Sequence, residues 1–297
     1  MNTLNIIIGC GDVGKRIAKS LNLQGESVTA LSHQKSSQMT LKQQGINSIS
    51  ADLDDPASLV DIDFQQSNIY YLAPPANEGD NDQRMKNFIH AQSQNKSPRR
   101  IVYISTTGVY GDAAGEWVTE NNPPAPQASR SKRRLDAENT LTRYCQQSNC
   151  EYNILRVSGI YCLSKLPLER LKAGVLALDL AIAPSSNRIH ADDLANIAIS
   201  AMTHKVSNQI FNVADGNPTS ITDYFIQVSK TFNLPPPTQI SREEAQSQIS
   251  DAMLSYLAES KKVSIDKLRH TLEITLQYPD LETGLKQCFA EYQLSHS

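Results

Sequence analysis

The fold is decided by residues 4–14, which read LNIIIGCGDVG. The apolar run at 4–8 predicts a buried strand, and residues 15–23 behind the turn predict a helix. Glycines at such a turn let the backbone approach a pyrophosphate, which the free N–H groups of the helix N-terminus attract. The alternative is a glycine-rich turn that serves only the packing of the helix on the strand. The residues of the predicted dinucleotide site are Gly9, Gly11, Asp12, Val13 and Gly14.

Composition narrows the class of protein. The chain has 297 residues, of which 39% are hydrophobic and 20% are charged, enough for one large domain or two coupled ones. Its net charge of −3 favours neither a nucleic acid nor an anionic membrane as a partner. The most apolar long stretch, residues 171–184, contains Lys172 and Asp179 and is too short to span a bilayer.

Cysteine usage and the start of the chain predict a reducing compartment. The five cysteines are scattered without a C-x-x-C pair, which predicts free thiols rather than disulfides or a metal site. The first predicted strand begins almost at Met1, which leaves no room for a signal peptide. We therefore expect a soluble cytoplasmic protein without a metal ion.

The first half of the chain alternates strand-like runs with helical segments. This alternation predicts an α/β fold, a Rossmann-type doubly wound parallel sheet with helices on both faces. Short apolar blocks such as Ile101–Ile104 are typical of strands that are buried on both sides. We place this dinucleotide-binding domain at residues 1–157. The predicted strands are 4–8, 27–31, 46–50, 68–72, 100–105 and 152–157, and the predicted helices are 15–23, 36–44, 81–94 and 129–147.

The second half, residues 158–297, is less regular and predicts a smaller substrate lobe. We expect it to cap the carboxyl edge of the sheet, where ligands of such folds bind, and to interleave with the sheet. The loop at 108–127 is long enough to be functional, and the polar stretch 241–260 is expected on the surface. The predicted elements of this half are helices at 192–203, 221–232 and 281–294 and a strand at 209–213.

Further motifs follow in a fixed order, and together they resemble a known superfamily. They are ADL at 51–53, YYLAPP at 70–75, IVYISTTGVYG at 101–111, ILRVSGIY at 154–161, RIHADDLA at 188–195 and FNVADG at 211–216. Their order and spacing resemble the extended short-chain dehydrogenase/reductases, which include NAD(P)-dependent nucleotide-sugar epimerases and dehydratases. The resemblance covers nearly the whole chain. The GCGDVG turn is similar to an atypical branch, since most extended members carry GxxGxxG.

The resemblance implies NAD or NADP as the cofactor and assigns its contacts. Gly9, Gly11 and Gly14 would face the pyrophosphate. Asp52 and Leu53 would border the adenine, although Asp52 is equally well explained as a turn or cap residue. The residues that would line the channel for the nicotinamide-side ribose are Leu72, Ala73 and Pro74.

The end of the second predicted strand bears on the choice between NAD and NADP. A carboxylate there would bind the ribose 2′-hydroxyl, whereas a cation would accept a 2′-phosphate. The chain has Ser32, His33 and Lys35 at this place and no carboxylate. Lys35 therefore favours NADP, and the alternative is an ordinary surface charge.

The catalytic set of the superfamily, a Ser or Thr with Tyr-x-x-x-Lys, is only partly present. Thr106 matches the first position. With Glu138 as the register, the Tyr position falls on Arg130 and the Lys position on Arg134, on one face of the predicted helix. Arg134 keeps the charge needed to bind a ribose or phosphate, whereas Arg130 cannot serve as an acid/base because a guanidinium does not deprotonate in proteins. The alternative is a solvated basic helix face.

Other residues near the predicted site are weaker candidates. Dehydratases of this superfamily carry Asp-Glu directly after the active Thr, where this chain has Thr107 and Gly108, so water elimination is disfavoured. Tyr110 is a candidate catalytic group, with aromatic packing as the alternative. Glu120 is a possible second base or a solvent-exposed acid. His190 is expected to be structural or to line the substrate site, since no metal-ligand cluster accompanies it.

Arginines provide the candidate substrate contacts. In nucleotide-sugar enzymes an arginine near the RIHADDLA segment clamps the diphosphate, a task that suits a bidentate guanidinium, and a structural role is the alternative. The candidate substrate-binding residues are Arg130, Arg156 and Arg188.

Two hypotheses about function follow. The first is an NAD(P)-dependent oxidoreductase or epimerase with a non-standard acid/base, acting on a small molecule that is sugar-like or nucleotide-linked. The second is a catalytically inactive NAD(P)-binding redox sensor or regulatory module, because the acid/base tyrosine is missing. A monomer and a homodimer built on the helices at 81–94 and 129–147 are both compatible with the sequence.

Overall fold

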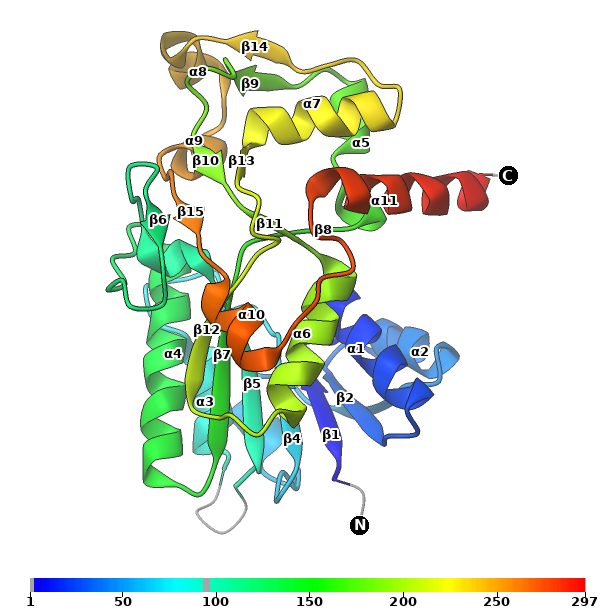
Figure 1. Cartoon of the computed structure of the whole chain (residues 1–297). Coiled ribbons are helices and arrows are strands. Elements are labelled where there is room, and N and C mark those ends of the chain that lie inside the picture. The colour runs from blue at the N-terminus through cyan, green and yellow to red at the C-terminus, as the bar shows by residue number, and fades with distance from the viewer. Residues whose placement is uncertain (1–2, 93–96, 297) are drawn as a thin grey trace.

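The computed structural model describes residues 3–92 and 97–296, and in these residues seven parallel strands form the central sheet (Figure 1). The order β12-β7-β5-β4-β1-β2-β3 reverses beside β1, which places a ligand-binding crevice at the carboxyl edge there. This confirms the predicted Rossmann-type α/β fold. The strands are β1 (Asn5–Ile8), β2 (Val28–Ser32), β3 (Asn47–Ser50), β4 (Asn68–Tyr71), β5 (Arg100–Thr106), β7 (Glu151–Val157) and β12 (Gln209–Val213).

Helices cover both faces of the sheet, because successive strand residues point to opposite faces and the residues on each face are apolar. Ile7 belongs to the core under α1 and α6, and its neighbours Ile6 and Ile8 belong to the core under α3 and α4. The helices of these layers are α1 (Asp12–Leu23), α2 (Lys35–Gln43), α3 (Gln83–His90), α4 (Ser129–Gln147) and α6 (Ala191–Thr203).

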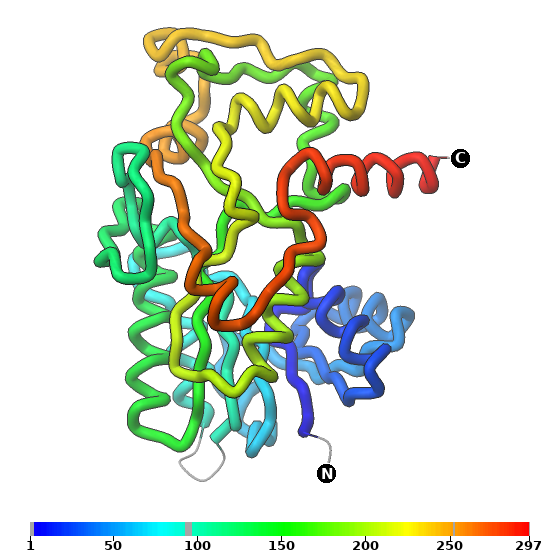
Figure 2. Tube along the Cα trace, in the orientation of Figure 1, coloured from blue at the N-terminus to red at the C-terminus, as the bar shows by residue number. Residues whose placement is uncertain are grey.

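The second half of the chain builds a cap above the carboxyl edge and also returns to the sheet. Figure 2 shows the chain leave the sheet after β7, return for α6 and β12, and leave again for the cap. A separate core built around Tyr161, Phe225 and Leu285 holds the cap together. The cap elements are β8 (Gly159–Tyr161), α5 (Leu168–Lys172), β9 (Leu176–Leu178), β10 (Ser185–Ser186), β11 (Arg188–His190), β13 (Thr219–Ser220), α7 (Ile221–Thr231), β14 (Thr238–Ile240), α8 (Arg242–Gln248), α9 (Asp251–Leu257) and α11 (Leu281–His296).

Several connections differ from the prediction. The loop at 108–127 contains a short 3-10 helix, η2 (Thr107–Tyr110), and β6 (Trp117–Val118), which pairs with β15 (Lys262–Val263). The polar stretch 241–260 folds into α8 and α9. The helix predicted at 81–94 is shorter, and residues 93 and 94 lie outside the described residues. The remaining helices are η1 (Pro56–Leu59), η3 (Leu163–Lys165) and α10 (Asp266–Leu272).

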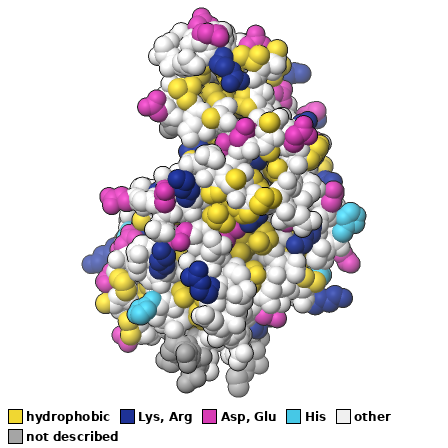
Figure 3. Space-filling view, turned by 90° about the vertical axis from the view of Figure 1, so that its left-hand side faces the viewer, with side chains coloured by type: hydrophobic (Ala, Val, Ile, Leu, Met, Phe, Trp, Pro, Cys, Tyr) yellow, Lys and Arg dark blue, Asp and Glu magenta, His cyan; other side chains and the backbone are white. Residues whose placement is uncertain are grey.

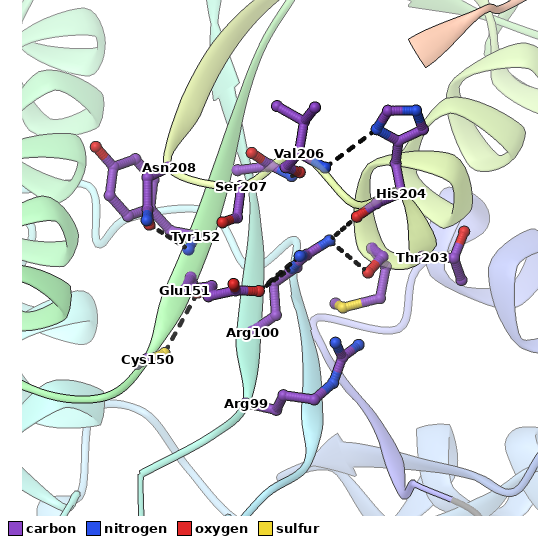
Figure 4. A network of polar contacts seen from close by, with 12 residues as sticks. Arg99, Arg100, Cys150, Glu151, Tyr152, Thr203, His204, Val206, Ser207 and Asn208 are labelled. Carbon is purple, nitrogen blue, oxygen red and sulfur yellow. Dashed lines mark hydrogen bonds and ion pairs between the residues drawn. The ribbon is translucent and has the colours of Figure 1, made fainter. Parts of the chain in front are cut away.

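A buried arginine closes the amino edge of the sheet (Figure 4). Arg100, at the start of β5, is 3% exposed, and its Nη2 pairs with a Glu151 oxygen at 2.6 Å. Its Nη1 donates to the carbonyls of Met202 and His204 at the C-terminal end of α6, at 2.9 and 2.5 Å. A cation is favoured there because the last carbonyls of a helix lack partners and carry negative partial charge.

Two whole-chain properties complete the description. All five cysteines are unpaired thiols. Among the residues that the structure describes, no helix has both the length and the apolar character required to cross a bilayer.

Candidate functional site

The glycine turn has the geometry that a pyrophosphate requires. Gly9 has a φ of +87°, and a Cβ there would lie 2.5 Å from the backbone nitrogen of Ala73, so a side chain would clash with the end of β4. Gly11 has no atom within 4 Å of its Cβ position, so the turn is open on that side. Gly11 also precedes α1 without a side-chain cap, which leaves the first N–H groups of the helix for an anion. The turn therefore fits a dinucleotide pyrophosphate.

The other residues of the turn anchor it. Val13 and Gly14 are buried in the first turn of α1. Asp12 pairs with Arg16 at 3.2 Å, and Arg16 also forms an ion pair with Asp192 in the first turn of α6. Arg16 thereby links the first turns of α1 and α6. Its positive charge balances part of the negative charge of the two carboxylates beside the predicted pyrophosphate.

The end of β2 is accessible, as a ribose site must be. Ser32 is partly buried, and its carbonyl accepts a hydrogen bond from Gln38 at 2.8 Å. His33 and Lys35 are exposed, and Lys35 is the first residue of α2. The contact of these residues with a 2′-phosphate stays a prediction.

Asp52 and Leu53 follow β3 in a tight turn. The Asp52 carboxylate accepts the backbone N–H of Asp54 at 2.9 Å, which matches the turn role that the sequence left open. The Leu53 side chain is partly buried, and its carbonyl accepts a hydrogen bond from Asn87 at 2.8 Å. Their predicted contact with adenine stays a prediction.

Arg134 lies where the loop after β4 meets the end of β5. Its Nη1 donates to the carbonyls of Ala73 and Ile104, at 3.1 and 3.0 Å, and to the Tyr103 hydroxyl at 3.2 Å. The helix α4 thus holds a cation against residues 72–74, the predicted ribose channel. In the described residues no acceptor is bonded to its Nη2, which leaves donors for a ribose hydroxyl.

A cavity of about 560 Å³ lies between the carboxyl edge and the cap. The space-filling view shows the molecule indented between the upper lobe and the body (Figure 3). This volume is typical of small-molecule sites. The end of β5, the segments that follow β4, β5 and β7, and α4 contribute Pro74, Thr106, Thr107, Gly108, Arg130, Ser131, Arg133, Arg134 and Ser158, and the cap contributes Ser186, Arg188, Ile221, Met253, Tyr256, Glu259 and Lys261.

The cavity is strongly cationic. Its lining in the described residues includes five basic side chains and a single carboxylate. Such a lining favours an anionic ligand, because clefts lined by one sign of charge concentrate the opposite sign. The basic residues are Arg130, Arg133, Arg134, Arg188 and Lys261, and the carboxylate is Glu259.

Arg188 is a buried cation without a carboxylate partner. It is 8% exposed, it lies over the Tyr224 ring at 4.0 Å, and its Nη2 donates to the Ser186 hydroxyl at 3.2 Å. No carboxylate in the described residues forms an ion pair with it. Burial lowers the pKa of its guanidinium. A buried charge of this kind is costly unless a ligand pairs with it.

Unpartnered buried polar atoms gather at this cavity. Each belongs to a lining side chain, is shielded from solvent and has no hydrogen-bond partner. Because buried polar groups are normally hydrogen-bonded, such a group of atoms indicates a polar ligand. The atoms are Arg133 Nε, Ser158 Oγ, Arg188 Nε and Glu259 Oε1.

The structure brings Thr106 and Arg130 to the cavity. The Thr106 Oγ1 accepts the backbone N–H of Gly108 at 3.1 Å, so its hydroxyl hydrogen can still be donated. Arg130 donates to the Ser255 hydroxyl at 3.2 Å and lies 4.3 Å from the Tyr256 ring centre. It therefore connects α4 to the cap.

Tyr110 and Arg156 do not line the cavity. The Tyr110 hydroxyl donates to Asn212 at 2.7 Å, and the Arg156 guanidinium lies 4.8 Å from the ring of Tyr110. Arg156 also pairs with the buried Glu138 at 2.8 Å. Both residues thus have protein partners in the core, which explains their residue types without a substrate.

The two remaining candidates also have protein partners. The Glu120 carboxylate accepts the backbone N–H of Asn212 at 2.7 Å. His190 is buried, its Nδ1 accepts the N–H of Asp192 at 3.3 Å, and its ring lies between Tyr161 and Tyr278. Within residues 3–92 and 97–296, no group of three His, Cys, Asp or Glu side chains is placed to hold a metal ion.

Sequence reasoning missed Glu259 and Lys261. They follow α9 at the end of the stretch expected on the surface, yet their side chains are only 14% and 8% exposed. Alternating charged residues at the end of a polar stretch give no local signal of burial. Glu259 pairs with Lys261, and Lys261 also donates to the carbonyl of Gly111, 150 residues away, a contact that only the tertiary fold creates.

Residues 6–214 match the model of the NAD dependent epimerase/dehydratase family. The chain belongs to this family. The match includes the glycine turn, the Thr106 segment, α4 and β12, and ends where the chain enters the last part of the cap.

The chain is also similar, over nearly its whole length, to a curated protein and to solved structures. Protein YeeZ of Escherichia coli (strain K12) is 24% identical over 286 residues, which cover 92% of this chain and 96% of YeeZ. A functionally unknown conserved protein from Silicibacter pomeroyi DSS superposes with a TM-score of 0.82 at 24% identity and covers 98% of this chain and 99% of its own. A UDP-glucose 4-epimerase of Thermotoga maritima, solved with UDP-glucose, has a TM-score of 0.81 at 16% identity. The match covers 99% of this chain and 100% of the epimerase chain.

Proposed function

We propose that this protein binds NAD(P) along the carboxyl edge and oxidises or epimerises a hydroxyl group of an anionic, nucleotide-linked sugar. The observation that carries the proposal is the cationic cavity with its unpartnered buried donors. A nucleotide diphosphate would pair with these donors, and Arg188 is the candidate clamp. The solved Thermotoga maritima relative holds UDP-glucose, which supports this class of substrate.

The chain's own residues fit the cofactor. The open side of the turn at Gly11 and the N-terminus of α1 would bind the pyrophosphate, and Arg134 would bind the nicotinamide-side ribose. The family is NAD dependent, and we propose NADP as the preferred form because Lys35 is exposed at the end of β2 and no carboxylate is there.

A bound NAD(P)⁺, held by the turn at Gly11 and by Arg134, would supply a hydride acceptor for the carbon that carries the hydroxyl. Thr106 would orient that hydroxyl by donating a hydrogen bond, since its Oγ1 only accepts within the protein. The position of the family tyrosine is taken by Arg130, which cannot exchange a proton.

A matched pair of glycine variants tests the cofactor site. Gly11→Ala adds a methyl group in open space, so the melting temperature should be unchanged while NAD(P) affinity falls at least about tenfold. Gly9→Ala should instead destabilise the fold, because of its φ of +87° and the contact with Ala73. Calorimetry with NAD⁺ and NADP⁺ measures the first effect. Equal affinity of Gly11→Ala and wild type would contradict the proposed site.

A second candidate function is a cofactor-binding regulator without turnover. The specific observation in its favour is Arg130, which binds Ser255 and Tyr256 of the cap instead of providing an acid/base. A screen of nucleotide sugars that follows nicotinamide absorbance separates the two. Turnover that Thr106→Ala reduces supports the enzyme, and binding of substrate without any turnover supports the regulator.

A further inference from the structure

Oxidation of a hydroxyl group requires a residue that takes its proton. The helix α4 provides Arg130 and Arg134 at the two family positions, and guanidinium groups stay protonated. Arg133 and Arg188 also line the cavity and are guanidinium groups too, and the remaining ionisable side chains of its lining in the described residues are Tyr256, Glu259 and Lys261.

Glu259 is a largely buried carboxylate on the lining of the cavity. Its Oε2 accepts from the Lys261 ammonium at 2.7 Å, and its Oε1 is shielded from solvent with no hydrogen-bond partner. A buried carboxylate oxygen normally has a partner, so a donor from a ligand is missing here. A substrate hydroxyl is such a donor.

Lys261 holds this carboxylate in place. Its ammonium also donates to the Gly111 carbonyl at 2.5 Å, and its own carbonyl accepts from the Asn187 amide at 3.0 Å. Gly111 ends the segment that begins with Thr106, so the contact ties the cap to the carboxyl end of β5. Glu259 and Thr106 are thereby placed on the lining of one cavity.

The two other ionisable groups fit the role less well. The Tyr256 side chain is 65% exposed, and its ring is covered by Arg130. The Lys261 ammonium already donates to two acceptors and carries no proton-accepting lone pair while charged.

We propose that Glu259 is the acid/base residue of this cavity and that Lys261 is its positioning residue. The inference rests on the proposed function. In the oxidising direction the Glu259 carboxylate takes the proton of the substrate hydroxyl. The carbonyl double bond forms from the O–H electrons as the carbon-bound hydrogen leaves with its electron pair to NAD(P)⁺. In the reducing direction the protonated Glu259 returns the proton to the carbonyl oxygen.

The first test observes the carboxylate itself. Full-length protein with ¹³C-labelled glutamate carboxyl groups is saturated with NAD⁺ and titrated with UDP-glucose, and Glu259→Gln assigns the signal. We expect the Glu259 resonance to move on addition of UDP-glucose. The resonance of Glu243, which is exposed on α8 and assigned through Glu243→Gln, should stay in place. If Glu259→Gln does not fold, Glu259→Asp gives the assignment.

The same signal tests Lys261. Lys261→Met removes the ammonium that donates to Glu259 Oε2, so the Glu259 resonance should no longer move on addition of UDP-glucose, and Lys261→Arg should restore the movement. A lysine that served only the contact with the Gly111 carbonyl would leave the response of Glu259 unchanged.

The second test is turnover. Glu259→Gln should lower the rate of nicotinamide reduction at least about 100-fold and keep UDP-glucose affinity within about threefold, whereas Glu243→Gln should match wild type. If UDP-glucose binds and the Glu259 resonance does not move, the inference is overturned, whether or not the sugar is turned over. If wild type binds neither NAD⁺, NADP⁺ nor UDP-glucose, the proposed function fails and the inference falls with it.

Discussion

Two arginines, one at the amino edge of the central sheet and one in the cap above its carboxyl edge, are almost equally buried, at 3% for Arg100 and 8% for Arg188. Arg100 at the amino edge has a carboxylate and helix carbonyls as partners. Arg188 in the cap has a serine hydroxyl and the face of a tyrosine. A buried cation whose donors all have protein partners stabilises the fold. A buried cation with unpartnered donors is expected to bind a ligand. Burial alone therefore does not separate structural from functional charges, and the list of partners does.

The largest expected effect is at the amino edge. Arg100→Leu leaves the last carbonyls of α6 without a partner and removes the ion pair with Glu151, so the free energy of unfolding should fall by about 4 kcal/mol. Urea denaturation measures it. Lys286→Leu, which removes an exposed pair with Glu282 on α11, is the control and should leave the urea midpoint unchanged. If Arg100→Leu were as stable as this control, Arg100 would not be a structural charge, and its contrast with Arg188 would fail.

The second prediction concerns Asp215, a buried carboxyl group just after β12, which makes the free energy of unfolding depend on pH. Burial raises the pKa of Asp215 to about 7, and its carboxylate accepts the N–H of Asn217. Since the unfolded pKa is near 4, wild-type stability is full below about pH 4 and is lost as the pH rises through about 7. Asp215→Asn should lack this loss, so its free energy of unfolding should gain up to about 4 kcal/mol on that of wild type between pH 4 and 8. Urea denaturation of both proteins at several pH values in that range measures the effect. If their free energies of unfolding change equally with pH, the raised pKa of Asp215 is contradicted.

The smallest effect concerns the exposed Lys35. Lys35→Ala should weaken NADP⁺ binding by about 0.5–1 kcal/mol, a few-fold change, and leave NAD⁺ binding unchanged, because an exposed ion pair is screened by solvent. Calorimetry at low and high salt measures both affinities. Tighter binding of NAD⁺ than NADP⁺ by wild type would show that Lys35 is an ordinary surface charge.

The parts of the molecule that sequence could predict are those encoded locally. The bounds of α4 and β12 agree with the predicted 129–147 and 209–213, because their apolar periodicity and flanking residues act over short distances. Thr106, Arg130 and Arg134 are the positions that the resemblance to the superfamily implies, and all three line the cavity.

The rest depended on contacts between distant segments. Tyr110 turns toward Asn212, 102 residues further along the chain, and Arg156 turns toward Glu138 on α4. Neither direction is encoded near the residue itself. Glu259 pairs with Lys261, which bonds the carbonyl of the distant Gly111. The sequence therefore predicts which helices and strands form, but not the direction in which these side chains point.

The central claim is that the unsaturated charges at the carboxyl edge bind a ligand. The most direct test is calorimetric titration of the NAD⁺-saturated protein with UDP-glucose, for wild type and Arg188→Leu, with urea denaturation of both. We predict at least tenfold weaker binding by Arg188→Leu, with a free energy of unfolding equal to or above that of wild type. Equal affinity of the two proteins, or a loss of stability as large as that of Arg100→Leu, would contradict the account.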